Sequence, residues 1–553
     1  MTKIDKISKI YQKVLLICLI FVLLVSLAAC GTKGAKNSTE DVDAVINGDI
    51  TGEITVSCYD SMTYKSFLEE AAQKFEAAFP GTKVNVETFS AMPEIRTGGN
   101  GNTQMATVRM EDDPQGRVDY VNKVNTSLMS GAGADIFALD ALPLQKYVES
   151  NNLANLTDYM NSDPGFNLAD YQENIFEAGQ YAGGNYFLPL DYNFNYYAYD
   201  SSLVPDNMAA NFGMDKSYST QELLDLAMPL FDGEHKIFNS VDYMKGISSR
   251  MSIDLFSQLL KEQYSSFVDL EHKKANFNSQ AFIDLLTKVK KYGEEGYVNQ
   301  GAALRSQMQS NIQMRPPGGG SGNPGERPSG NQSGGNPFAD ADRHFFKSNN
   351  SFSLQQYFNR NSNLRIGIMY AGMGASNDED DEIAGIESNG GGQVPFTYNQ
   401  AYGINANSEN KSTAWAFLKF LLSEEIQVSS SLSPMGNPVQ KNARAQKAEM
   451  MLTGTFMGRR PGGMGGGYNF SANDASGRSD EPDEPMDDET REVLNKYLGA
   501  LEEFSSLINA YDVRDTLVDD MIAEQVDYFF SGEKSAEEVA QSLQGKVDLY
   551  LSE

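Results

Sequence analysis

The sequence is poor in the residues that build metal and redox sites. It has three cysteines, three histidines and one tryptophan among 553 residues. The histidines stand far apart, at 235, 272 and 344, so they cannot form a local His/Cys zinc site. The sequence also lacks the Gly-x-Ser-x-Gly elbow of serine hydrolases, the His-Glu-x-x-His motif and a phosphate-binding glycine loop. We therefore expect no metal and no cofactor.

Basic residues are scarce as well. Lys and Arg number 44 against 75 Asp and Glu, which gives a formal net charge of −31. A chain this acidic repels nucleic-acid phosphates and anionic lipid headgroups. We therefore expect no nucleic-acid partner. The chain is long enough to bury a large core and to form two or more domains.

Long apolar runs are confined to the N-terminus. Four lysines within the first 13 residues precede an apolar run at 14–29, which is shorter than the roughly 20 residues that span a bilayer. A charged head followed by such a run is typical of a signal peptide. The run ends in Leu27-Ala28-Ala29-Cys30-Gly31, which resembles a bacterial lipobox. That resemblance implies that residues 1–29 are removed and that a lipid on Cys30 anchors the protein to the cell membrane, facing outward. A signal-anchor helix is the alternative.

Few cysteines are left for cross-links. Only Cys30 and Cys58 would remain after cleavage of the leader, and Cys30 would carry lipid, so no intrachain disulfide is expected. Cys58 lies within a segment at 54–59 that has the pattern of a buried strand. We predict that its thiol is an inert part of the core.

The first part of the folded chain alternates strands and helices. Residues 30–51 are polar and have the composition of a flexible spacer. Strands are predicted at 54–59 and 83–89, with an amphipathic helix at 64–79 between them. Such a strand–helix–strand unit predicts a parallel sheet with a right-handed crossover.

Further elements follow the same alternation. They are a polar excursion at 92–125, strands at 134–140, 364–370 and 400–404, an extended aromatic run at 186–199, and helices at 142–151, 221–231, 253–264, 280–292 and from Ser412. Ser219 and Glu222 form a capping box, and the helix from Ser412 is expected to bury Trp415. A C-terminal helical stripe is expected to bury Val513, Leu517, Met521 or Ile522, Val526 and Phe529. Two low-complexity inserts, at 315–337 and 458–485, are expected to be disordered surface loops. A contact role with the cell wall or a partner is the alternative for these inserts.

Four segments occur in the order found in a known family. They are the strand and helix at 54–79, Gly133-Ala134-Asp135-Ile136, the run from Phe187 to Tyr197, and Tyr402-Gly403-Ile404-Asn405 with the helix at 411–421. On a chain with a lipobox, they resemble the extracellular solute-binding proteins of ABC importers, the group that includes the maltose-binding type. The likeness covers most of residues 52–553. It implies an α/β fold of the class II periplasmic-binding-protein type, with two lobes joined by crossing strands.

The resemblance also implies how the chain divides and works. Residues 52–190 and about 400–440 would form the N-terminal lobe, and residues 191–399 and about 441–553 the C-terminal lobe. A small solute would be held by closure of the lobes. The protein partner would be the transmembrane permease of an ABC importer, and the receptor would be a monomer.

Candidate ligand-binding residues come from a general rule for open α/β sheets. Ligands bind outside the carboxyl ends of the strands, which selects residues that follow predicted strands or lie on the crossings. They are Asp60, Ser61, Met62, Asp140, Asp191, Tyr192, Asn193, Tyr398 and Asn399. Helix N-capping is the alternative role for Asp60, Ser61 and Asp140, and hinge packing is the alternative for Tyr192. The resemblance adds Tyr357, and Tyr243 is a further candidate.

The resemblance implies a carbohydrate as the solute and a receptor rather than an enzyme. Sugars stack on aromatic rings and form hydrogen bonds with carboxylates and amides, and the chain has 27 tyrosines. Its one tryptophan is predicted to lie in the core, so a smaller sugar, a peptide or another polar solute stays open. The competing class is a surface-anchored glycan hydrolase with two catalytic carboxylates. Turnover of a glycan would distinguish the enzyme from the receptor.

Overall fold

The structure is a computed structural model of the whole chain. It describes residues 42–59, 64–89, 114–131, 133–139, 142–239, 251–298, 344–349, 352, 381–390, 392–428, 436–452, 486, 488–512 and 514–552. The chain divides into two compact units, Met1–Gly48 and Asp49–Glu553. In the first unit the described residues form one short helix, α2 (Val42–Ile46). Cys30 and the leader lie outside the described residues.

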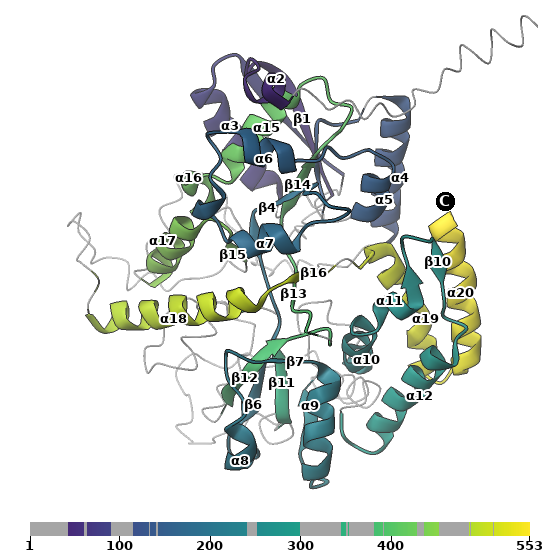
Figure 1. Ribbon diagram of the computed structural model, residues 1–553. Helices are drawn as coiled ribbons and strands as arrows, with labels where there is room; N and C mark the ends of the chain where they lie inside the picture. The colour runs from purple at the N-terminus through teal and green to yellow at the C-terminus, as the bar shows by residue number, and fades with distance from the viewer. Residues whose placement is uncertain are drawn as a thin grey trace, which may run out of the picture. The chain divides into compact units, whose positions relative to one another are not determined.

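The second unit contains a five-stranded sheet built from both halves of the chain (Figure 1). Its strand order is β2 (Thr82–Thr88), β1 (Gly52–Cys58), β3 (Ile136–Ala138), β14 (Ala401–Ile404) and β4 (Leu188–Pro189). β1 is parallel to both β2 and β3, whereas β14 is antiparallel to β3 and β4. α3 (Tyr64–Ala78) connects β1 with β2, so the predicted parallel strand–helix–strand unit is confirmed.

Helices cover this sheet and complete the first lobe. α3 packs with α15 (Lys411–Leu421), where the Phe75 and Phe417 rings lie 5.1 Å apart. A separate core forms around α4 (Pro114–Ser130) and α5 (Leu144–Glu149). The prediction of a polar excursion over 92–125 is wrong for residues 114–125, because α4 buries Tyr120, Val121 and Val124 in that core. The polar composition of the segment favoured the wrong prediction, although its apolar residues recur at helical spacing.

A second five-stranded sheet forms the second lobe. Its strand order is β7 (Ser217–Tyr218), β12 (Asp381–Glu387), β6 (Tyr196–Asp200), β11 (His344–Asn349) and β8 (Lys236–Asn239). β6 is antiparallel to both β11 and β12, which in turn are parallel to β8 and β7. Four strands of this sheet therefore run in one direction, and β6 is antiparallel to them.

The helices of the second lobe were largely predicted. α9 (Thr220–Ala227) begins with the Ser219/Glu222 capping box, and α10 (Met251–Lys261) and α12 (Gln280–Glu294) occupy the expected positions. α19 (Thr516–Phe530) and α20 (Ala536–Ser552) pack against these helices and against each other. The stripe of α19 buries Ile522, not Met521.

Crossing segments join the two lobes. After β4 the chain forms β5 (Asp191–Tyr192), which pairs with β15 (Asn437–Pro438), and then enters β6. The return crossing leads the chain back from the second lobe to the first. It contains β13 (Pro395–Phe396), which pairs with β16 (Ala510–Tyr511). The α/β fold with two lobes and crossing strands is confirmed, whereas the residue boundaries of the lobes stay a prediction. α17 (Lys441–Leu452) and α18 (Asp488–Leu507) pack together beside the crossings.

The remaining described elements are short. They are α6 (Thr157–Ser162), α7 (Glu173–Ala178), α8 (Asp206–Ala209), α11 (Tyr264–Phe267), β9 (Val268–Asp269), β10 (Lys274–Ala275), α16 (Glu424–Gln427) and the 3₁₀ turns Leu168–Asp170 and Met228–Leu230. Cys58 and Trp415 are buried, as predicted. The strand predicted at 364–370 and both inserts lie outside the described residues. In the part of the chain that the structure describes, no helix has the length and apolar character needed to cross a membrane.

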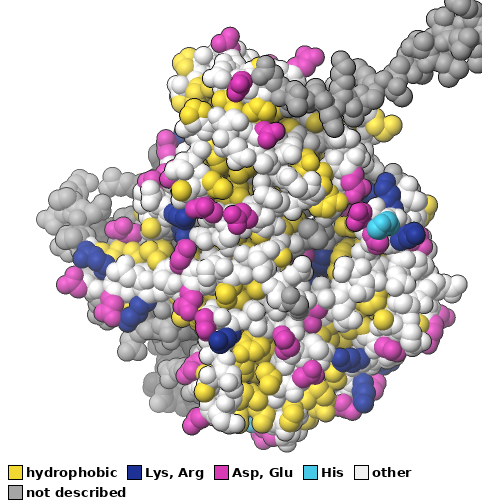
Figure 2. Space-filling model, in the orientation of Figure 1, with side chains coloured by type: hydrophobic (Ala, Val, Ile, Leu, Met, Phe, Trp, Pro, Cys, Tyr) yellow, Lys and Arg dark blue, Asp and Glu magenta, His cyan; other side chains and the backbone are white. Residues whose placement is uncertain are grey.

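Acidic side chains are scattered over the face of the molecule shown in Figure 2. Lys and Arg are fewer on that face. The view thus agrees with the net negative charge of the sequence.

Candidate functional site

The crossings connect the carboxyl edges of the two sheets. β1, β2, β3 and β4 are parallel, so the residues that follow them lie at one edge of the first sheet. In the second sheet, β7, β8, β11 and β12 end at the edge where β6 begins. The chain leaves the first sheet at the end of β4 and enters the second at the start of β6. This arrangement places the crossings where open α/β sheets bind ligands.

Asp191 lies at the start of the first crossing and is fully buried. One of its carboxylate oxygens accepts hydrogen bonds from the backbone N–H groups of Asn399, at 2.7 Å, and Gln400, at 3.4 Å. The other oxygen accepts from Asn399 Nδ2 at 3.2 Å. Burial raises the pKa of Asp191, although these hydrogen bonds oppose the rise. The carboxylate therefore ties the first crossing to the return crossing, and its contact with solute stays a prediction.

Gly436 and Lys447 lie close to this carboxylate. A Cβ atom at Gly436 would overlap the Asp191 carboxylate and stand 2.7 Å from Asn399 Nδ2, so glycine is needed here for lack of space. Lys447 projects from α17 and is buried. Burial lowers the pKa of Lys447 to about 8, and the charge of Asp191 opposes this decrease. The first crossing thus carries a buried carboxylate with a buried ammonium group near it.

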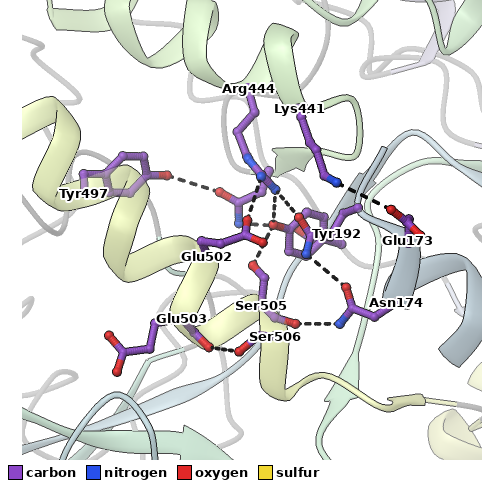
Figure 3. Close-up of polar contacts among 12 residues, drawn as sticks. Glu173, Asn174, Tyr192, Lys441, Arg444, Tyr497, Glu502, Glu503, Ser505 and Ser506 are labelled. Atoms are coloured by element: carbon purple, nitrogen blue, oxygen red, sulfur yellow. Dashed lines mark hydrogen bonds and ion pairs between the residues drawn. The ribbon is translucent and has the colours of Figure 1, made fainter. Parts of the chain in front are cut away.

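Tyr192 lies at the centre of a polar network between the crossing and helices α17 and α18 (Figure 3). Arg444 donates through Nη1 to the Tyr192 hydroxyl at 2.6 Å and to Gln172 Oε1 at 3.0 Å, and through Nη2 to Glu502 at 3.1 Å. The Tyr192 hydroxyl also lies 2.7 Å from Ser505 Oγ. Burial raises the pKa of Tyr192. This geometry supports hinge packing, and a ligand contact by Tyr192 stays a prediction.

Asn193 continues the crossing as part of a two-residue bridge. Its backbone N–H donates to the Thr397 carbonyl at 2.7 Å, and Thr397 N–H donates back at 2.9 Å. Its buried Oδ1 atom accepts no hydrogen bond from the described residues. A buried amide oxygen without a donor is uncommon, so Asn193 stays a candidate for a solute contact.

Tyr398 is half-buried and belongs to an aromatic group on the return crossing. Its ring is nearly parallel to that of Tyr511, with centroids 5.6 Å apart and an interplanar angle of 6°. The Tyr511 hydroxyl donates to the Tyr398 hydroxyl at 3.0 Å. The Phe187 ring lies 5.4 Å from Tyr398 and 5.3 Å from Tyr511. Rings in this position can stack on a planar or apolar ligand face.

A second aromatic group, which was not predicted, lies at the ends of β1 and β2. Tyr59 and Phe89 directly follow these strands, and their rings are 6.5 Å apart. Tyr120 of α4 lies 5.7 Å from Tyr59 and 5.6 Å from Phe89. Tyr59 and Phe89 are half-buried, whereas Tyr120 is buried. The rule that ligands bind outside the carboxyl ends of strands could have found Tyr59 and Phe89, because each is the last residue of a predicted strand.

A buried charged group lies at the carboxyl edge of the second sheet. Lys261 Nζ is 3.2 Å from Glu387 at the end of β12 and 3.7 Å from Asp512. Asp512 also accepts from Arg514 at 3.0 Å. Glu262 is nearby, and burial raises its pKa to about 7. Nothing in the sequence identified this group, since its members come from segments far apart in the chain.

The other predicted ligand-binding residues lie outside the described residues. They are Asp60, Ser61, Met62, Asp140, Tyr243 and Tyr357. The structure therefore brings together Asp191, Tyr192, Asn193, Tyr398 and Asn399 at the crossings. Among the described residues, no group of three or more His, Cys, Asp or Glu is placed to hold a metal ion.

Comparison with known proteins now identifies the family. Residues 100–448 match the family described as bacterial extracellular solute-binding protein. The chain belongs to this family. It is an extracellular solute-binding protein. The resemblance inferred from the sequence is thereby confirmed. No curated protein matches the sequence.

Solved structures of solute-binding proteins are similar over most of this chain. One is a family 1 extracellular solute-binding protein from Alicyclobacillus acidocaldarius, with 14% identity, coverage of 91% of this chain and 99% of that chain, and a TM-score of 0.47. A substrate-binding protein from Listeria monocytogenes in complex with cycloalternan has 14% identity, coverage of 91% and 99%, and a TM-score of 0.44. A cyclic α-maltosyl-1,6-maltose binding protein from Arthrobacter globiformis has 13% identity, the same coverage and a TM-score of 0.45.

Proposed function

We propose that this protein is a lipid-anchored receptor that captures a carbohydrate and delivers it to the permease of an ABC importer. The observation that carries the proposal is the pair of aromatic groups at the carboxyl edge of the first sheet. Tyr59 and Phe89 follow β1 and β2, and the stacked pair Tyr398 and Tyr511 lies on the crossings. A sugar ring presents apolar C–H faces that pack on such rings, and hydroxyl groups that need polar partners around them.

Polar side chains stand beside these rings. Asn193 and Asn399 lie on the two crossings, and Asn193 carries the amide oxygen that no described residue supplies with a donor. Amide groups accept from and donate to sugar hydroxyls. Tyrosines take the stacking role here because the one tryptophan is buried, with its Nε1 atom donating to Asp163 at 2.7 Å. The composition of the site therefore favours a small saccharide.

The proposed mechanism is closure of the lobes about the crossings. Residues 52–190 with about 400–440 and residues 191–399 with about 441–553 would move as two bodies, as one monomer. The crossings contain the buried contacts of Asp191 and Tyr192, which limit the motion to a defined hinge. Closure around a solute changes the conformation of the receptor. The permease thereby meets a surface that differs from that of the empty receptor.

A binding screen tests the solute class. The mature protein is heated with saturating maltose, maltotriose, cellobiose or short peptides, and its melting temperature is measured. We expect a saccharide to raise the melting temperature, because a ligand at 100 times its Kd stabilises by about 2.7 kcal/mol. Chromatography should recover the saccharide intact. Stabilisation by peptides alone, or cleavage of the saccharide, would refute the carbohydrate receptor.

Substitution of the aromatic platform makes this test specific. Tyr398→Ala should weaken binding of the stabilising saccharide at least about tenfold, which corresponds to 1.4 kcal/mol of lost stacking. Tyr528→Ala is the matched control, because Tyr528 is also half-buried but lies on α19, where Lys534 covers its ring at 4.3 Å. Equal loss in both variants would mean that general stability, not stacking, governs the affinity.

The anchor has its own test. We expect Cys30→Ala to prevent lipid attachment, so that the precursor stays uncleaved or the protein is released from the membrane. Fractionation of cells detects release from the membrane, and mass spectrometry of the N-terminus shows whether the precursor has been cleaved. A Cys30→Ala protein that is cleaved after Ala29 and still retained in the membrane would contradict lipid anchoring.

A further inference from the structure

Helix α4 of the first lobe packs against α19 of the second. The two helices lie in different cores, since Val121 and Val124 of α4 belong to the first and Ile522 and Val526 of α19 belong to the second. Leu517, at the start of α19, is nevertheless buried in the core of the first lobe. This interface therefore joins the lobes independently of the crossings.

The polar centre of the interface is the ion pair between Arg117 and Asp520. Arg117 Nη2 donates to both carboxylate oxygens of Asp520, at 2.7 and 2.6 Å, and Arg117 Nε donates to one of them at 3.1 Å. The side chains are 15% and 19% exposed. Such a pair is partly shielded from water, and the planar guanidinium group holds its partner in a defined orientation.

A second contact between the lobes lies nearby. Lys146 of α5 donates to the backbone carbonyl of Tyr550 at 2.7 Å, and its Nζ atom lies 3.8 Å from the centre of the Tyr550 ring. The Tyr550 hydroxyl donates to Asp515 at 2.8 Å, and Asp515 caps α19 through the N–H groups of Leu517 and Val518. The contact of Lys146 is therefore connected to the start of the helix that carries Asp520.

Topology places the ion pair at the side where the sheets would receive solute. α4 leads from the carboxyl end of β2 to the amino end of β3, so its first turn, with Arg117, lies toward the carboxyl edge of the first sheet. α19 begins shortly after Asp512, which contacts Lys261 next to the end of β12. Asp520 thus lies near the carboxyl edge of the second sheet. Figure 1 shows α4 and α5 on the same flank of the molecule as α19 and α20.

We propose that Arg117 and Asp520 form a latch that holds the two lobes together in the absence of solute. The proposal rests on the lobe motion of the proposed function and concerns its regulation. With the latch formed, the lobes are drawn together at their carboxyl edges, and opening must first separate Arg117 from Asp520. The latch sets how often the empty receptor opens, and so how fast a solute can enter.

The test measures the distance between the lobes without any solute. Spin labels are placed on the mature lipoprotein at Met129→Cys and Leu226→Cys, positions that are 90% and 39% exposed on α4 and α9. The buried Cys58 does not react, and Cys30 is blocked by its lipid, so a mass spectrum should count two labels. We expect a short distance in the otherwise unchanged protein. Arg117→Ala or Asp520→Ala should raise the ratio of long to short distances at least about fivefold.

Two further variants make the result decisive. The charge exchange Arg117→Asp with Asp520→Arg should restore the short distance. Lys546→Ala breaks a surface ion pair with Glu524 at 2.8 Å within the second lobe and should leave the distance unchanged. Unchanged distances in both single variants, or long distances that the exchange does not restore, would overturn the latch. Neither result depends on a saccharide, so failure of the latch is distinguishable from failure of the carbohydrate screen.

Discussion

Replacing Asp163 with alanine is expected to destabilise the first lobe by about 3–5 kcal/mol, because removal of one partner leaves buried donors unpaired. Asp163 follows α6 and is 5% exposed. Its carboxylate accepts from Trp415 Nε1 at 2.7 Å, from Lys419 Nζ at 2.5 Å and from the Gly165 N–H at 2.7 Å. The loop after α6 is thereby attached to α15, at the only tryptophan of the chain.

Urea unfolding monitored by tryptophan fluorescence measures this loss of stability directly, since Trp415 is the only tryptophan in the chain. Asp163→Asn is the matched control. It keeps one oxygen, which can accept from either Trp415 or Gly165, and it removes the charge that faces Lys419, so about 1–3 kcal/mol should be lost. An alanine variant that unfolds within about 1 kcal/mol of the unchanged protein would show that the loop finds other partners.

The same carboxylate predicts a pH dependence. Burial alone would raise the pKa of Asp163, but the hydrogen bonds from Lys419, Trp415 and Gly165 lower it below its usual value. The unfolded chain therefore takes up this proton at a higher pH than the folded chain does. The stabilisation is fully present above the unfolded pKa, near 4, and is lost as the pH falls toward the folded pKa. The asparagine variant should lack this part of the acid sensitivity.

Local patterns predicted the elements that depend on neighbours in the sequence. The period of apolar residues located α3 and α15, and the capping box located the start of α9. These features act within a few residues, so the sequence displays them directly. α4 was not predicted because more than half of its residues are polar, so the segment as a whole has the composition of a loop.

Contacts between distant segments could not be predicted in the same way. Arg444 reaches Tyr192 across 252 positions of sequence, and Arg117 reaches Asp520 across 403. A charged side chain has no pattern that indicates its partner, and only the folded topology brings the two together. The rule that ligands bind outside the carboxyl ends of strands partly overcame this limit, because the rule depends on the topology of the sheet and not on neighbouring residues. It selected Asp191 and Tyr398 correctly as residues of the crossings, although their role toward solute stays a prediction.

At the crossings, replacing Asp191 with alanine is expected to cost about 3–5 kcal/mol of stability and to loosen the hinge. Two backbone N–H groups, of Asn399 and Gln400, would lose their acceptor in a buried place, and so would the Asn399 side chain. Lys447 would lose the opposite charge that partly compensates its burial. Asp191→Asn is the control, because its oxygen can still accept from the backbone while the charge is removed.

Lys447 gives this prediction a second, independent measurement. Burial lowers its pKa from the usual lysine value of 10.5 to about 8 in the folded protein. Between these values the unfolded chain binds more protons, so the contribution of Lys447 to stability rises with pH across this window. Lys447→Met should remove that rise, of about 1–3 kcal/mol, in denaturant unfolding at pH 7.5 and 10. If Asp191→Ala unfolds like the unchanged protein, or Lys447→Met keeps the full pH dependence, then the buried charges do not hold the crossings.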